Sequence, residues 1–276
     1  MRFSRVLRAG AAIAAASLAL AACANPGGGG DSGDSGGEGT IRVGIKFDQP
    51  GMGQKQGENN YTGFDVELAK FIAKELGYEE NQIEFKEAVS DDRETMLKNG
   101  DVEYIVGTYS ITDERKEVVD FVGPYFIAHQ DLLVRKDYPD LTKEELAKAK
   151  IKLCSVTGST SAANVKQELA KNADLKEYKG YSQCVGALES KAVDALTTDD
   201  TILAGYAAQN EGKFKLLGLK LTDEHYGVGL PKDSDIKDKV KAAVQKWIDD
   251  GHWEEAAKKY LGPAGYEIPE PPTLED

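Results

Sequence analysis

Several hydroxyl side chains and an arginine follow an apolar segment in the middle of the chain. The segment 102–107 is predicted to be a strand, and it runs into 108–112 (Thr-Tyr-Ser-Ile-Thr) before Arg115. A strand ending in this way exposes N–H and O–H donors at one edge of a sheet, where the planar guanidinium of Arg115 could bind a carboxylate. The flanking Asp113 and Glu114 are also typical of a solvent-exposed helical turn, and composition alone favours that second interpretation.

The chain shows none of the common catalytic motifs. It has no glycine-rich phosphate loop, no G-x-S-x-G sequence and no histidine paired by spacing with a nucleophile. His129, His225 and His252 lie at no metal-ligand spacing relative to the cysteines. We therefore expect no metal, no cofactor and no enzymatic activity.

Alternating strands and helices are expected to position the hydroxyl residues and Arg115. The first unit is predicted to contain a strand at 41–45, a helix at 64–76, a strand at 82–86, a helix at 91–99 and the strand at 102–107. This β-α-β-α-β order predicts an α/β layer with a parallel sheet.

A second unit of the same type begins near Gln130. Its predicted strands and helices, followed by the elements that end the chain, are strands at 131–135, 151–156 and 193–197, helices at 161–171 and 182–190, a strand at 226–230, and helices at 235–250 and 253–261. A proline-rich tail, 263–276, is expected to wrap the surface. Two α/β units in series predict a ligand cleft between them.

The N-terminus has the pattern of a secretory signal at 1–22. Three arginines within the first eight residues precede an apolar run, 11–22, which is too short to span a bilayer. The run ends in Leu-Ala-Ala directly before Cys23, which predicts a lipidated cysteine that anchors the protein to the outer face of the cell membrane. The alternative is an ordinary signal with Cys23 as a bystander. Residues 23–39 are rich in glycine and serine and predict a disordered tether.

The mature chain is strongly acidic. Without the three signal arginines, 31 Lys+Arg remain of 34 against 47 Asp+Glu, a net charge of −16. Such a charge repels nucleic acid, so nucleic acid is not expected as a partner. An anionic ligand would have to be held by a local cluster of cations.

Two cysteines remain besides Cys23. Cys154 falls on a predicted strand and Cys184 on a predicted helix of the second unit. In a secreted chain such a pair favours a disulfide, although two buried thiols are the alternative.

Three segments, in order along the chain, resemble the family 3 extracellular solute-binding proteins of polar amino-acid ABC importers. They are 107–125 around Arg115, 63–68 (Gly-Phe-Asp-Val-Glu-Leu) and 193–199 (Val-Asp-Ala-Leu-Thr-Thr-Asp). The segments 46–51 and 182–184 further resemble the glutamate-binding lipoproteins of actinobacteria. The resemblance covers Thr40 to about Leu261. It implies a two-lobed periplasmic-binding-protein-like fold with a two-strand hinge, in which 40–127 and 226–276 form lobe 1 and 128–225 forms lobe 2.

The resemblance also implies ligand-binding roles. Arg115 would bind the α-carboxylate of an amino acid, and Asp199, or less favourably Asp200, its α-ammonium group. The hydroxyl residues expected to assist are Thr108, Ser110, Ser159 and Thr160. Because Arg115 and Asp199 come from different lobes, a zwitterionic ligand would favour closure of the lobes.

The ligand side chain is expected to be acidic, with glutamate favoured. Lys46 and Arg93 are the candidates to bind its carboxylate, although Lys46 could be a solvent-facing strand end and Arg93 could cap the helix at 91–99. Gln49 aligns with a position that is often an aromatic platform in the family, and Phe47 or Tyr61 could substitute for it.

The expected partners are a free amino acid, the permease subunits of an importer and, through Cys23, the bilayer; the protein is expected to be a monomer. Other readings are a glutamine, aspartate or asparagine binder, a ligand-sensing ectodomain, or a dehydratase acting on prephenate or arogenate.

Overall fold

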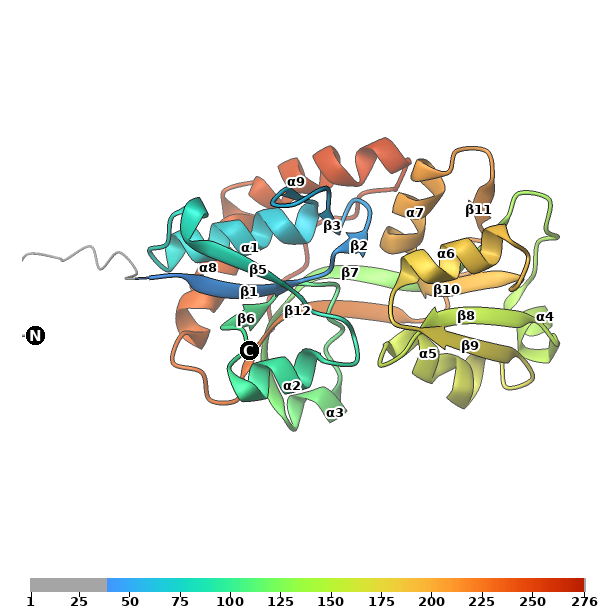
Figure 1. Ribbon diagram of the computed structural model, residues 1–276, viewed down its shortest axis with the longest axis horizontal. Helices are drawn as coiled ribbons and strands as arrows, with labels where there is room; N and C mark the ends of the chain where they lie inside the picture. The colour runs from blue at the N-terminus through green and yellow to red at the C-terminus, as the bar shows by residue number, and fades with distance from the viewer. Residues whose placement is uncertain (1–38, 276) are drawn as a thin grey trace, which may run out of the picture. The chain divides into compact units, whose positions relative to one another are not determined.

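The computed structural model describes residues 39–275, which form an α/β fold with helices on both faces of a mixed sheet (Figure 1). The predicted signal peptide, Cys23 and all of the predicted tether except Gly39 lie outside the described residues. No helix within 39–275 combines the length and the apolar character needed to cross a bilayer. We keep the names lobe 1 and lobe 2 for the residue ranges given above.

Lobe 1 is built on the N-terminal strands and the returning C-terminal chain. Its strands are β1 (Ile41–Ile45), β5 (Ile83–Glu87), β6 (Tyr104–Ile105), the first part of β7 (Val119–Arg135) and most of β12 (Asp223–Pro231), with a small second sheet of β2 (Asp48–Gln49), β3 (Gly53–Lys55) and β4 (Tyr61–Thr62). Its helices are α1 (Phe64–Glu75), η1 (Glu80–Gln82), α2 (Arg93–Asn99), α3 (Asp113–Lys116), α8 (Lys237–Asp249), α9 (His252–Tyr260) and η3 (Gly262–Ala264).

Lobe 2 repeats the alternation of strands and helices. Its strands are the last part of β7, β8 (Lys152–Val156), β9 (Asp174–Tyr178), β10 (Ala195–Asp199) and β11 (Phe214–Leu216). Its helices are α4 (Lys143–Lys148), α5 (Thr160–Asn164), η2 (Val165–Leu169), α6 (Tyr181–Glu189) and α7 (Asp200–Gln209).

The long strand β7 belongs to the sheets of both lobes. The strand order is β5-β1-β6-β12-β7-β10-β8-β9, with β11 also paired to β7. The pairing of β7 changes from β12, at His129 opposite Asp223, to β10, at Gln130 opposite Asp199. The two long strands β7 and β12 thus run side by side, in opposite directions, where the chain passes between the lobes.

The sheet is only partly parallel. The prediction of a parallel sheet in the first unit is confirmed, because β1 pairs parallel with β5 and β6, and β8 pairs in the same way with β9 and β10. The later strand β12, for which the sequence predicted no direction, pairs antiparallel with β6 and β7. The reason is that β12 returns from lobe 2 alongside β7, so that its direction opposes that of its neighbours.

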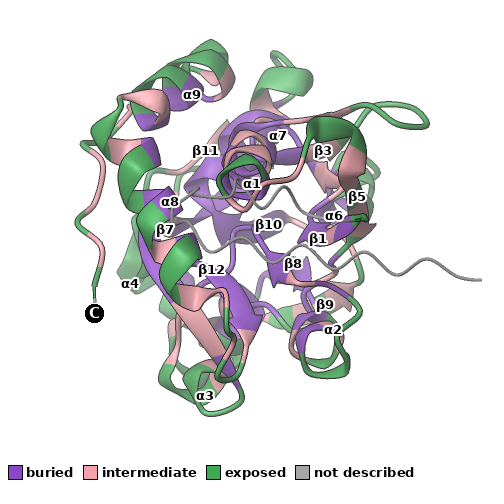
Figure 2. Ribbon diagram, turned by 90° about the vertical axis from the view of Figure 1, so that its left-hand side faces the viewer, coloured by how far each residue is buried: buried purple, intermediate pink, exposed green. Residues whose placement is uncertain are grey.

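Aromatic packing holds the helices of lobe 1 on the sheet. The ring of Phe64, at the start of α1, lies 5.0 Å from that of Trp247 and 5.7 Å from that of Trp253. All three side chains are buried, and each such burial contributes about 1.5–3 kcal/mol. Trp253 also donates from Nε1 to the carbonyl of Tyr125 at 2.7 Å. Figure 2 shows the same pattern across the fold: buried residues gather on the central strands and on the helix faces turned toward them.

Several local predictions differ from the structure. The expected strand at 102–107 is regular only over Tyr104–Ile105, and Thr108, just beyond its expected end, has a φ of 46°. The expected helix at 161–171 is α5 followed by the π-helical turn η2. The prediction also missed α7, a buried helix whose apolar residues show no amphipathic period.

Two other predictions are confirmed. Cys154 on β8 and Cys184 on α6 form a disulfide, with Cα atoms 5.6 Å apart. The proline-rich tail packs along the surface: the ring of Tyr266 lies 6.3 Å from that of Phe126, and the N–H of Glu275 donates to the carbonyl of Gly123 at 2.8 Å.

Candidate functional site

Two basic side chains of lobe 1 are buried beside the end of β1. Lys46 is 3% exposed and Arg93, at the start of α2, is 2% exposed. Lys46 donates from Nζ to the hydroxyl of Ser90 at 2.8 Å, and Arg93 donates from Nη1 to the carbonyl of Gly107 at 3.0 Å. Within residues 39–275 neither side chain forms an ion pair, so both cations are buried against neutral acceptors.

This burial is unfavourable for the charged forms. Burial, followed by the nearby Arg93, lowers the pKa of Lys46 to about 7. Burial and the charge of Arg115 lower the pKa of Arg93 to about 10. Because buried charges normally have a charged partner, a neighbouring anion would stabilise both cations.

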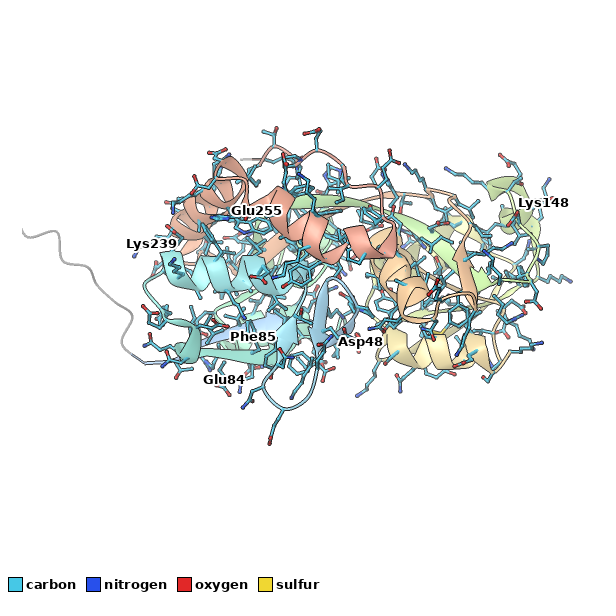
Figure 3. All side chains as sticks on the ribbon, turned by 90° about the horizontal axis from the view of Figure 1, so that it is seen from above. Asp48, Glu84, Phe85, Lys148, Lys239 and Glu255 are labelled. Atoms are coloured by element: carbon cyan, nitrogen blue, oxygen red, sulfur yellow. A yellow bond between two sulfur atoms is a disulfide. The ribbon has the colours of Figure 1, made fainter. Side chains whose placement is uncertain are left out.

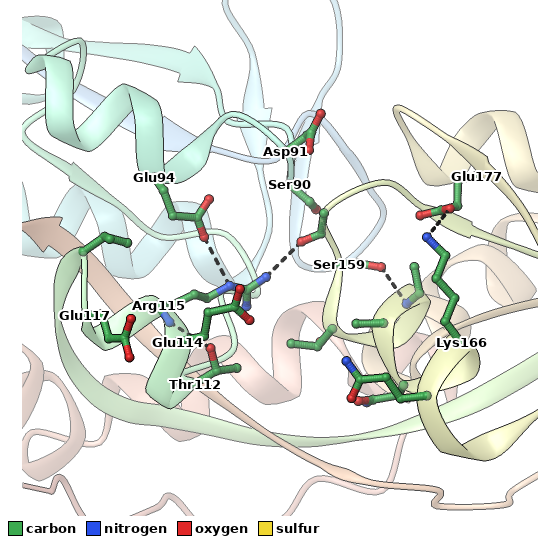
Figure 4. A pocket seen from close by; sticks show the side chains of 17 residues that line it. Ser90, Asp91, Glu94, Thr112, Glu114, Arg115, Glu117, Ser159, Lys166 and Glu177 are labelled. Carbon is green, nitrogen blue, oxygen red and sulfur yellow. Dashed lines mark hydrogen bonds and ion pairs between the residues drawn. The ribbon is translucent and has the colours of Figure 1, made fainter.

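Arg115 lies where the two lobes meet. Its backbone N–H donates to the hydroxyl of Thr112, which is the N-cap of α3. Its guanidinium donates to the carbonyl of Ser110 at 2.7 Å and, across the cleft, to the carbonyl of Gly158 at 2.9 Å. Nε lies 3.2 Å from a carboxylate oxygen of Glu94, as Figure 4 shows.

The ring of Tyr109 supports both arginines. The guanidinium carbon of Arg93 lies 4.0 Å from the ring centroid and that of Arg115 lies 5.0 Å from it. The hydroxyl of Tyr109 donates to Glu94 at 2.7 Å. Such cation–π contacts hold guanidinium groups in place while leaving N–H donors free for other partners.

Lobe 2 contributes a buried carboxylate at the end of β10. Asp199 is 4% exposed and accepts from the hydroxyls of Tyr226 at 2.6 Å and Ser161 at 3.4 Å. Burial, followed by the charge of Glu224, raises its pKa to about 8. Its neighbour Asp200 accepts instead from the N–H of His129, at the hinge, and from the hydroxyl of Tyr266, in the C-terminal tail.

The turn before α5 and the first residues of α5 touch both charged ends of the site. Gly158 in the turn accepts from Arg115, and Ser161 in α5 donates to Asp199. The hydroxyl of Thr160 lies 3.3 Å from that of Ser110 and donates to Glu224 at 2.8 Å. A Cβ on Gly158, which has φ +77°, would come within 2.7 Å of the Cα of Asp91, so this approach of the lobes requires glycine.

Ser159 is the N-cap of α5. Its hydroxyl accepts from the N–H of Ala162 at 3.0 Å and lies 3.3 Å from the hydroxyl of Ser155. The structure therefore gives the Ser159 side chain a structural partner within its own lobe.

Thr108 is fixed on the lobe 1 side of the cleft. Its N–H donates to the carboxylate of Asp65 at 2.8 Å, and its hydroxyl lies 2.8 Å from the carbonyl oxygen of Gly107 and 3.1 Å from the side-chain oxygen of Gln49. Asp65 also accepts from Tyr125, and burial raises its pKa to about 7. This carboxylate explains how a β-branched residue is held at positive φ.

Three buried side-chain atoms have no hydrogen-bond partner within residues 39–275: Gln49 Nε2, Arg93 Nε and Thr198 Oγ1. The first two belong to one connected set, since Gln49 accepts from Thr108 and Arg93 donates to the preceding Gly107. Unpaired buried donors of this kind are costly unless another group accepts from them.

The aromatic substitutes considered for the platform make other ring contacts. The rings of Phe47 and Tyr61 lie 5.2 Å apart, and Tyr61 lies 4.9 Å from Phe85 on β5. The ring of Tyr109 is the one that lies against the guanidinium groups of Arg93 and Arg115. Sequence reasoning assigned no role to Tyr109, Glu94 or Glu224, and only Tyr109, next to Ser110, stood within a segment singled out as chemically active.

A cavity of about 750 Å³ opens at the rim of this cluster (Figure 4). Arg115, Glu94 and Thr160 line it together with other residues of α2, α3 and α5. In the part of the chain that the structure describes, no group of three His, Cys, Asp or Glu side chains is arranged to hold a metal ion.

Comparisons with known proteins identify the family of the chain. Residues 41–263 match the bacterial extracellular solute-binding proteins, family 3. The glutamate-binding protein GluB of Corynebacterium efficiens is 40% identical over 271 residues, covering 94% of this chain and 92% of that protein. The glutamine-binding protein GlnH of Bacillus subtilis is 40% identical over 223 residues, covering 80% of this chain and 81% of that protein.

A solved structure shares the fold. An ancestral arginine-binding protein bound to glutamine superposes with a TM-score of 0.74 at 33% identity, covering 82% of this chain and 99% of that one. The two-lobed α/β fold expected from the sequence is thereby confirmed. The chain belongs to the family 3 bacterial extracellular solute-binding proteins.

Proposed function

We propose that the protein captures an acidic amino acid, with glutamate as its ligand, and delivers it to an ABC importer. The observation that carries this proposal is the burial of Lys46 and Arg93 against neutral acceptors. An anionic side chain would supply the missing counter-charge. A neutral side chain would leave both cations buried without one.

The remaining groups suit the other end of the same ligand. Arg115 provides a guanidinium for the α-carboxylate, and Thr160 and Ser110 provide hydroxyls next to it. Asp199 provides the carboxylate for the α-ammonium group. The ammonium would also lower the raised pKa of Asp199, because it stabilises the charged carboxylate.

The names of the relatives support the assignment. Two relatives from Corynebacterium, 40% and 44% identical, are glutamate-binding proteins. A lipid anchor on Cys23 would keep the protein at the outer face of the membrane, where the permease subunits of an importer would accept the ligand from the closed form.

Isothermal titration calorimetry tests the proposal on the mature protein. Glutamate, glutamine, aspartate and asparagine are titrated at pH 7 under identical conditions. We expect glutamate to bind at least tenfold more tightly than glutamine, because glutamine offers no charge to Lys46 and Arg93. Equal or tighter binding of glutamine would overturn the acidic assignment, and heat from none of the four would overturn amino-acid capture.

Glutamine is the second candidate. It is supported by the relative from Bacillus subtilis and by the glutamine-bound ancestral protein. Its side-chain oxygen could accept from Gln49 Nε2 or Arg93 Nε, the unpaired donors described above. The titration with glutamate and glutamine separates the two ligands directly.

A further inference from the structure

We infer that the lobes are held together by a second contact, made by protein alone, and that Asp48 and Gly205 determine it. The contact joins the hairpin 48–55 of lobe 1 to α6 and α7 of lobe 2. We call it the hairpin contact. This inference rests on the proposed function, because it concerns how the cleft closes on its ligand.

The carboxylate of Asp48 caps α6 from the opposite lobe. Its Oδ2 accepts from the N–H of Ser182, in the first turn of α6, at 3.1 Å. The residue before the helix is Gly180, where a Cβ would lie 2.6 Å from the same oxygen. A carboxylate at the N-terminus of a helix is favoured by its dipole and its free N–H groups. Figure 3 labels Asp48 where the hairpin approaches lobe 2.

Helix α7 approaches the hairpin more closely than most residues would allow. A Cβ at Gly205 would lie 2.0 Å from the carbonyl oxygen of Pro50 and 2.8 Å from its carbonyl carbon. Both atoms are backbone, so they cannot move aside as a flexible side chain could. The neighbouring Tyr206 donates its hydroxyl to the carbonyl of Asp48. At the end of the helix, Gln209 donates to Gln54 at 3.4 Å.

The hairpin is firmly joined to lobe 1. The N–H of Phe64 donates to the carbonyl of Gly51 at 3.0 Å, and the N–H of Asp65 donates to the carbonyl of Met52 at 3.0 Å. These are free N–H groups at the start of α1, so the hairpin closes the end of a helix in its own lobe. The hairpin is therefore expected to move together with the rest of lobe 1.

Asp48, Pro50 and Gly205, which form the hairpin contact, are not among the residues assigned to glutamate. Arg115, Asp199 and Thr160 bridge the lobes at the ligand site. Asp48, Pro50 and Gly205 bridge them at the hairpin. Ligand affinity therefore depends on both contacts, because binding is measured with the lobes closed and a loss at either contact opposes closure.

Two helical glycines provide a matched test. Gly205→Ala adds a methyl group that the closed form cannot hold. Gly186→Ala, in α6, adds the same methyl group at an exposed position with nothing within 4 Å. Alanine is the better helix former at both sites, so neither change should prevent folding, which thermal melting checks.

We expect Gly205→Ala to weaken glutamate binding by at least tenfold in calorimetry and Gly186→Ala to leave it unchanged. Small-angle X-ray scattering at saturating glutamate should give a larger radius of gyration for Gly205→Ala than for the other two proteins. Equal affinity and identical scattering, with and without glutamate, would overturn the inference. A wild-type protein that binds no amino acid would instead refute the proposed function, while the scattering of the two variants still decides on the contact.

The carboxylate is tested separately with Asp48→Ala. We expect about tenfold weaker glutamate binding, since the lost hydrogen bond is assisted by charge. We also expect faster hydrogen exchange of the Ser182 amide in the glutamate-bound protein. Unchanged exchange together with unchanged affinity would exclude Asp48 from the contact.

Discussion

The charged groups that we assign to the ligand differ in sign between the two lobes. Lobe 1 contributes the cations Lys46, Arg93 and Arg115. Lobe 2 contributes the buried carboxylates Asp199 and Glu224. Burial shifts the pKa values of Lys46, Arg93 and Asp199 away from their charged forms. These buried charges therefore need a counter-charge that their own lobe does not supply.

A ligand with two carboxylates and one ammonium group would complement both faces at once. Its carboxylates would neutralise the cations of lobe 1, and its ammonium would meet the carboxylate of lobe 2. Variants that change the charge of one lobe at a time test this complementarity.

Removing one of the two principal charges should have the largest effect. Arg115→Ala and Asp199→Ala each leave a charge of the ligand buried without its partner, which costs about 3–5 kcal/mol. Calorimetry should show glutamate binding weaker by about a few hundredfold to a few thousandfold. Retention of affinity within tenfold of wild type in either variant would show that the altered residue does not bind the α-carbon groups.

Removing a cation from the deep part of lobe 1 should change selectivity more than general affinity. Lys46→Met and Arg93→Met remove hydrogen bonds to the side-chain carboxylate, each worth about 1.5–3 kcal/mol. The preference for glutamate over glutamine should fall by about tenfold or more in each variant.

Lys98→Met, an exposed position on the same helix as Arg93, is the matched control and should keep the wild-type preference. If both buried variants also keep it, the assignment of the side-chain subsite is wrong.

The glutamate affinity should change with pH in opposite directions for the buried groups of the two lobes. The pKa of Lys46 lies at about 7, so glutamate must restore its proton above that pH, and affinity falls as pH rises through about 7. The pKa of Asp199 lies at about 8, so the ammonium group must displace its proton below that pH, and affinity rises with pH up to about 8.

Titrations of the wild type and Lys46→Met between pH 6 and 9 isolate the first effect. The affinity ratio of wild type to variant should fall as pH rises through about 7, by less than tenfold per unit. A ratio independent of pH would mean that Lys46 does not exchange its proton with ligand binding.

The disulfide should have the smallest effect on binding. Cys154 and Cys184 tie β8 to α6 within lobe 2 and touch none of the charged groups above. The double variant with serine at both positions should lose about 3 kcal/mol of unfolding free energy, measured by urea denaturation. At a temperature where the variant is folded, its glutamate affinity should match that of the wild type; a change above threefold would mean that the disulfide shapes the site.

Sequence reasoning reached the elements that have a local signal. Apolar spacing marks the helix that begins at Phe64. A glycine, Gly100, marks the turn after Asn99, where the structure has a positive φ. The helix α7 has no such period, because every residue from Asp200 to Tyr206 is buried. The direction of β12 depends on its pairing with β7, about 100 residues earlier in the chain, which no local pattern encodes.

The site shows the same division. The segment around Arg115 was identifiable because hydroxyls and an arginine follow one strand. Glu224 and Asp65 were not, because each becomes part of the site only through partners distant in sequence, Thr160 and Thr108. Gly205 could be recognised only once the backbone of Pro50 lay beside it.

A crystal structure of the protein with bound glutamate decides whether these groups bind the ligand. We expect the α-carboxylate on Arg115, the ammonium group on Asp199 and the side-chain carboxylate within hydrogen-bond distance of Lys46 and Arg93. A bound glutamate whose side chain points away from both of these cations would contradict this expectation.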